Sequence, residues 1–143
     1  MRVLGLDVGR RRIGVAVSDP TGLIASPLEV IQVRSLKGAI SRVLDICREQ
    51  QAELIVVGLP VSLAGELGPQ AREVLEFTEA LRRRSPVPVE TWDERLSTVG
   101  ATRLLQAGGY DSRTMRDRLD AAAAAFMLQG YLDSRRRRAE TDQ

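Results

Sequence analysis

Short hydrophobic runs in the first 60 residues predict β-strands. Residues 2–8 and 13–18 are mostly apolar and are separated by a tight glycine-containing turn, which predicts an antiparallel hairpin. Residues 23–33 predict a third strand. Because Pro27 removes a backbone donor, we expect this strand at an edge of the sheet. Leu54–Val57 is wholly apolar and ends at Gly-Leu-Pro, which predicts a strand buried on both faces.

Helical spacing of apolar residues appears between and after these strands. It predicts helices over 35–51 and 69–84, with a strand over 87–92 following the second helix. A short helix is expected over 98–106, where a Gly-Gly pair stops it, and a loop over 110–114. The final helix is expected over 117–132, with small alanines along part of its length.

The order of these elements predicts an α/β fold. Three antiparallel strands followed by strand–helix–strand crossovers give a five-stranded mixed sheet, with the last two strands parallel and helices on both faces. The chain has 143 residues, which suits one domain, and we assign residues 1–133 to it. Residues 134–143 are highly charged and are expected to form a disordered tail.

Composition excludes several classes of chemistry. The chain contains no histidine and one cysteine, so histidine-based catalysis, disulfides within the chain and multi-cysteine zinc sites are ruled out. No apolar run approaches the ~20 residues that a membrane-spanning helix requires. The first apolar stretch is a short strand ending at Asp7, unlike a signal peptide, and a cytoplasmic location is expected.

Acidic residues occur where three predicted elements could converge. Asp7 ends the first strand, Asp93 and Glu94 follow the last strand, and Asp120 lies early in the final helix. Carboxylates converging from separate elements predict a divalent metal site. Neighbouring residues of a strand face opposite sides, so one of Asp93 and Glu94 would be the ligand, and we favour Glu94. Asp117 is the alternative to Asp120.

The basic residues suggest a polyanionic substrate. The net charge is only +2, but 20 of the 21 basic residues are arginines, whose guanidinium groups match phosphate geometry. Those near the acids could bind phosphates, and backbone N–H groups at a helix start could do the same. The candidate substrate-binding residues are Arg10, Arg11, Arg12, Arg95, Ser97, Thr98, Arg116 and Arg118.

The motifs that contain these acids resemble a known family. Leu6-Asp7-Val8-Gly9, Asp93-Glu94-Arg95-Leu96-Ser97-Thr98 and Asp120-Ala121-Ala122 are similar to those of the YqgF (RuvX) family of small bacterial RNase H-like proteins. The resemblance covers nearly the whole chain. It implies an RNase H-like fold and a nuclease that uses Mg²⁺ or Mn²⁺ bound by Asp7, Glu94 and Asp120.

The resemblance leaves the substrate open. It implies either processing of precursor 16S ribosomal RNA during ribosome biogenesis or resolution of Holliday junctions. Ser62 stands where the family often has Asn, and Glu66 stands where it often has Thr or Ser. These differences affect contacts with the substrate more than they affect the metal site. A junction resolvase must cut twice and should be a two-fold dimer. Few aromatics are available for an interface, which favours a monomer or weak homodimer and RNA processing.

Two other functions remain open from the sequence. The first is an ATP-binding protein of the actin and sugar-kinase type, in which Asp-x-Gly opens a phosphate loop. Such proteins need two related domains, and this chain supplies one. The second is a non-catalytic RNA-binding factor for ribosome assembly or transcription. Retention of acids at all three positions favours the metal-dependent endonuclease over both.

Overall fold

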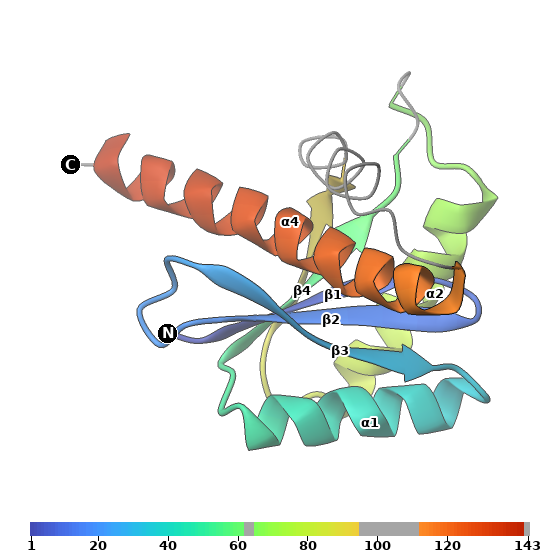
Figure 1. The fold of residues 1–143 in the computed structure, drawn as a ribbon. Helices are drawn as coiled ribbons and strands as arrows, with labels where there is room; N and C mark the ends of the chain where they lie inside the picture. The colour runs from blue at the N-terminus through green and yellow to red at the C-terminus, as the bar shows by residue number, and fades with distance from the viewer. Residues whose placement is uncertain (62–64, 95–111, 142–143) are drawn as a thin grey trace.

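A mixed five-stranded β-sheet forms the centre of the molecule in the computed structural model (Figure 1). The structure describes residues 1–61, 65–94 and 112–141, with side chains in the final helix described from Asp120 onward. The strand order is β3-β2-β1-β4-β5. The strands are β1 (Val3–Val8), β2 (Arg12–Ser18), β3 (Ala25–Gln32), β4 (Leu54–Leu59) and β5 (Val89–Asp93).

Strand pairing agrees with the predicted topology. The β1–β2 and β2–β3 pairs are antiparallel, whereas β1–β4 and β4–β5 are parallel. β3 is at an edge, as the proline at position 27 predicted. The predicted α/β class and five-stranded mixed sheet are therefore confirmed.

Helices cover both faces of this sheet. Helices α1 (Leu36–Glu49) and α2 (Pro69–Arg84) pack on one face, and α4 (Ser112–Thr141) lies across the other (Figure 1). Helix α1 begins where the Ser35 side chain accepts a hydrogen bond from the Gly38 backbone N–H. No helix in the described parts of the chain has the length and apolar character needed to cross a membrane.

Side-chain alternation along β1 determines which residues reach α4. Leu4 and Leu6 are buried in the core beneath α1 and α2, whereas Val3 is buried in the core beneath α4. Asp7 is two positions beyond Gly5 and four beyond Val3, so it shares the α4 face. The strand geometry alone therefore directs the Asp7 carboxyl toward the final helix.

The final helix is longer than predicted at both ends. It begins at Ser112, within the predicted loop, and continues to Thr141, through residues expected to be disordered. Residues 131–141 contain no glycine or proline, and arginine and alanine favour helix. An ion pair between Arg136 and Asp133, 2.9 Å and one turn apart, adds local support. The predicted helix over 98–106 lies outside the described residues.

Candidate active site

Two carboxyl groups meet on the α4 face of the sheet. Asp7 near the end of β1 and Glu94 immediately after β5 share a side-chain hydrogen bond. β4 lies between β1 and β5, so the pair bridges across that strand. Glu94 is two residues beyond Trp92, which packs against the core beneath α4, so strand alternation directs Glu94 to the same face. Glu94 rather than Asp93 therefore contacts Asp7.

The third acid approaches from α4. Asp120 lies near enough for its charge to raise the pKa of Asp7. Its carboxylate Oδ2 accepts a hydrogen bond of 2.7 Å from Nε of Arg12, and both side chains are a little over a quarter exposed. Arg12 thus holds Asp120 beside the Asp7–Glu94 pair and supplies a compensating positive charge.

Two glycines create the space in which these acids meet. A Cβ at Gly14 would lie 2.0 Å from the backbone carbonyl oxygen of Asp120, so α4 can seat on β2 only without a side chain there. A Cβ at Gly58 would lie 2.5 Å from Oε1 of Glu94 and would obstruct its path toward Asp7. Glycine within a strand commonly marks such close approaches.

Burial makes the ionised form of both paired acids unfavourable. Loss of solvent raises the pKa of Asp7; its hydrogen bond with Glu94 lowers that pKa, and the nearby charge of Asp120 raises it. Burial also raises the pKa of Glu94 to about 8, with further contributions from the charge of Asp7, the hydrogen bond with Asp7 and the charge of Asp93. The hydrogen-bonded pair therefore retains a shared proton to a higher pH than a free carboxyl would.

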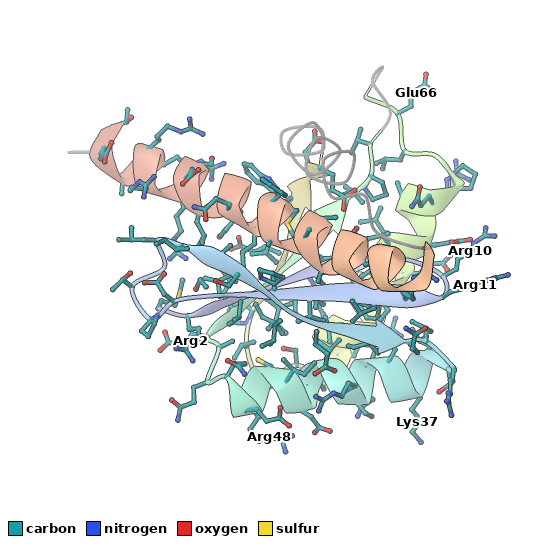
Figure 2. The ribbon with its side chains drawn as sticks, in the orientation of Figure 1. Arg2, Arg10, Arg11, Lys37, Arg48 and Glu66 are labelled. Carbon is teal, nitrogen blue, oxygen red and sulfur yellow. The ribbon has the colours of Figure 1, made fainter. Side chains whose placement is uncertain are left out.

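A cavity of about 610 Å³ opens at the β1–β2 turn, where Asp120 is the one of the three acids that lines it. Arg10, Arg11 and Arg12 line it together with Asp120 and apolar residues of α1 and α2. Figure 2 shows Arg10 and Arg11 projecting from this turn near the beginning of α4. Arg10 forms a two-pronged ion pair with Glu73 of α2, with a shortest distance of 2.6 Å.

The predicted site residues are thus only partly brought together. Asp7 contacts Glu94, and the charge of Asp120 acts on Asp7. Arg12, a predicted phosphate ligand, instead pairs with Asp120. Arg10 points to α2, and Arg11 lines the cavity. The remaining candidates lie outside the described side chains: Arg95, Ser97, Thr98, Arg116, Arg118 and the alternative acid Asp117.

The donor set is compatible with a hard divalent cation. Every candidate ligand supplies carboxylate oxygens, the ligands that Mg²⁺ and Mn²⁺ prefer. A cation in place of the shared proton would also relieve the repulsion between two adjacent, half-buried carboxylates. Within the described residues, however, no three acidic, histidine or cysteine side chains are grouped closely enough to hold a metal ion. The Asp7–Glu94 pair supplies two candidate ligands for such a cation.

Three features of the site were not predicted from the sequence. The first feature is the space left by Gly14 and Gly58, although a glycine inside a predicted strand does indicate a close approach. The ion pairs Arg12–Asp120 and Arg10–Glu73 were the others. Each joins residues more than 60 positions apart, so no local pattern could have indicated them.

A mixed sheet in this order, with acids from the first strand, the end of the last strand and the final helix, defines an RNase H-like nuclease fold. Thermus thermophilus RuvC in complex with a Holliday junction aligns with a TM-score of 0.60 and 19% identity, covering 94% of this chain and 96% of that one. The fowlpox virus resolvase aligns with a TM-score of 0.57 and 11% identity, covering 94% and 98%. At such identities the likeness concerns the fold alone.

Sequence similarity identifies the family. The family model of RuvX, described as a Holliday junction resolvase, matches residues 1–134, and the chain belongs to this family. A protein from Clostridium novyi named "Putative pre-16S rRNA nuclease" is 45% identical over 134 residues, which cover 94% of this chain and 99% of that protein. A protein of the same name from Desulforudis audaxviator is 45% identical over 136 residues, with 95% and 96% coverage.

The contact between α4 and β2 can be tested by adding one methyl group. Gly14→Ala should lower the free energy of unfolding by about 1–3 kcal/mol, because the added Cβ meets backbone that cannot rotate away. Urea denaturation measures the change. Gly68→Ala, where a Cβ meets nothing within 4 Å, should cost less than about 1 kcal/mol. Unchanged stability in Gly14→Ala would contradict the seating of α4 on β2.

The shared proton predicts a pH dependence of stability. Because the pKa of Glu94 rises from 4.5 to about 8 on folding, the folded state binds more protons than the unfolded state between those values. The free energy of unfolding of metal-free protein should therefore fall as pH rises from about 5 to about 8, by up to ~1.4 kcal/mol per pH unit. Urea denaturation across this range, with EDTA present, measures the slope.

Two variants test whether Glu94, and not another acid, causes this dependence of stability on pH. Glu94→Gln should flatten the slope, since its side chain cannot ionise. Glu49→Gln changes an exposed carboxyl on α1 and should leave the slope as in the wild type. Equal slopes in wild-type protein and Glu94→Gln would contradict the shared proton.

Proposed function

We propose that this protein is a metal-dependent endonuclease that hydrolyses phosphodiester bonds in precursor 16S ribosomal RNA. The observation that carries the proposal is the half-buried, hydrogen-bonded Asp7–Glu94 carboxyl pair with Asp120 near it. A purely structural role does not account for it, because two adjacent, half-buried carboxyls reduce stability. Such an arrangement becomes favourable when a cation and a phosphate occupy the site.

Asp7, Glu94 and Asp120 are the proposed ligands of Mg²⁺ or Mn²⁺. When bound, the ion would stabilise charge on the phosphate and lower the pKa of a water molecule. The protein contributes the partial burial that raises the pKa of Asp7 and Glu94, and the seating of α4 that orients Asp120. Arg12 keeps the Asp120 carboxylate in position.

The substrate would enter along the cavity at the β1–β2 turn. Arg11 lines this cavity, and its guanidinium could donate hydrogen bonds to backbone phosphates. Arg10 could also do so after exchanging Glu73 for phosphate, because both partners of that ion pair are exposed. Arg95, Arg116, Arg118, Ser97 and Thr98 complete the proposed set of phosphate contacts.

The named relatives favour RNA as the substrate. The Clostridium and Desulforudis proteins, which align over nearly their whole length, carry a name that specifies pre-16S rRNA. The family description specifies Holliday junctions instead, and that reaction requires two symmetric cuts. We propose a monomer or weak homodimer acting on RNA; cleavage assays on both substrates discriminate the alternatives.

Removing one acid tests the reaction. Asp7→Asn should reduce cleavage of a pre-16S rRNA fragment by at least ~100-fold, beyond the ~10–100-fold typical of residues that only orient metal ligands. Its thermal unfolding temperature should be unchanged or higher, because the fold already favours the neutral form of Asp7. Gel-based cleavage of the RNA fragment and of a four-way DNA junction measures the activity.

Asp45→Asn is the control for this substitution. Asp45 is an exposed aspartate on α1, on the other face of the sheet, and its variant should cleave like the wild type. Full activity of Asp7→Asn would rule out the proposed mechanism. Symmetric cleavage of the junction, without cleavage of RNA, would change the substrate to branched DNA.

Metal dependence gives a second test. Mg²⁺ or Mn²⁺ should support cleavage, whereas Ca²⁺ should not, because Ca²⁺ adopts looser coordination of higher number. Mn²⁺ should also raise the unfolding temperature of the wild type, since a ligand that binds only the folded state stabilises it. It should not do so in Asp7→Asn. Undiminished cleavage in EDTA would contradict the metal mechanism.

A further inference from the structure

The last turns of α4 form an exposed basic surface away from the acids. Leu132 is the final buried residue of the helix, and residues 135–141 are exposed. This segment contains four consecutive arginines, Arg135–Arg138, and one glutamate, Glu140. It continues as helix without a core to stabilise it, so burial does not explain its composition.

Two of these arginines are available to bind an anion. Ser134, Arg137, Arg138 and Thr141 line an open hollow of about 350 Å³. Their spacing of three and four residues puts all of them on one side of the helix. Among the described residues, neither Arg137 nor Arg138 forms an ion pair, whereas Arg136 pairs with Asp133.

Stabilisation of the helix end does not require this many arginines. Positive charge counteracts the helix dipole only within the last turn, and Arg138 already lies there. Arg135–Arg137 precede that turn. Each additional arginine repels its neighbours, so the run is better explained by a negatively charged partner.

The helix fixes the distance between this surface and the proposed active site. Figure 1 shows α4 as one continuous helix across the sheet, with the β1–β2 turn near its beginning. Asp120 and Arg138 are 18 residues apart in that helix, which corresponds to about 27 Å. At ~3.4 Å per base pair this is the length of about eight base pairs of B-form duplex.

We propose that Arg137 and Arg138 form a second nucleic-acid-binding surface that holds duplex phosphates about 27 Å from the site of cleavage. The proposal rests on the nuclease function proposed above. The chemistry recognised is the phosphate backbone, which RNA and DNA duplexes share. The surface orients a duplex along α4, so that the strand to be cut meets Asp120 at the other end of the helix.

Binding to duplexes of two lengths tests this surface. With EDTA present to prevent cleavage, Arg137→Ala/Arg138→Ala should bind a duplex of about 24 base pairs roughly 10- to 100-fold more weakly near 0.1 M salt. The slope of log affinity against log salt should become shallower by about 2, one for each lost phosphate contact. A duplex of about six base pairs, too short to reach both sites, should lose less than about twofold.

The control variant removes the same charge elsewhere. Arg48→Ala/Arg83→Ala changes exposed residues of α1 and α2, on the opposite face of the sheet, and should bind both duplexes as the wild type does. A loss as large in this control would show a net-charge effect and overturn the proposal. So would an unchanged affinity of Arg137→Ala/Arg138→Ala for the long duplex, or a loss confined to RNA or to DNA.

Cleavage by the wild type is measured separately, so that the two proposals fail differently. If Arg137→Ala/Arg138→Ala loses affinity for the long duplex but the wild type cleaves neither RNA nor junctions, the surface stands and the nuclease function fails. If the wild type cleaves but this variant binds normally, only the surface fails. Circular dichroism should show an intact fold, since both side chains are exposed.

Discussion

The contact between the backbone of α4 and Gly14 of β2 is the constraint on which the proposed site depends. The helix backbone at Asp120 occupies the space that any Cβ at Gly14 would fill. This contact sets the height of α4 above the sheet, and with it the distance of Asp120 from Asp7. A bulkier residue in β2 would lift the helix and separate the third acid from the other two.

The charges at this site lower the stability of the folded state. Asp7 and Glu94 lie half-buried beside one another, and their pKa values are raised first by loss of solvent and then by nearby negative charge. Arg12 offsets the charge of Asp120 only, through a hydrogen bond at one edge of the cluster. A protein selected for stability alone would place apolar groups at these positions. This loss of stability is consistent with a site organised for a cation and a phosphate.

The arrangement of charge along α4 links the site to the rest of the surface. The helix carries an acid next to the sheet at Asp120 and four arginines beyond the last buried residue, Leu132. A single rigid element therefore presents both a candidate ligand and a basic surface at a fixed separation. The β1–β2 turn, with Arg10 and Arg11, adds positive charge near the acidic end of the same helix.

The sequence by itself determined the five strands, α1 and α2, because these depend on local hydrophobic periodicity, and it placed one acid of the Asp93–Glu94 pair on the face of Asp7 through strand alternation without deciding which. Only the tertiary structure showed that Arg12 binds Asp120 and that Arg10 binds Glu73, since each pair joins distant parts of the chain. The helical conformation of residues 134–141 was also missed. Their polarity predicted disorder, but a helix already nucleated on the sheet can be extended one residue at a time.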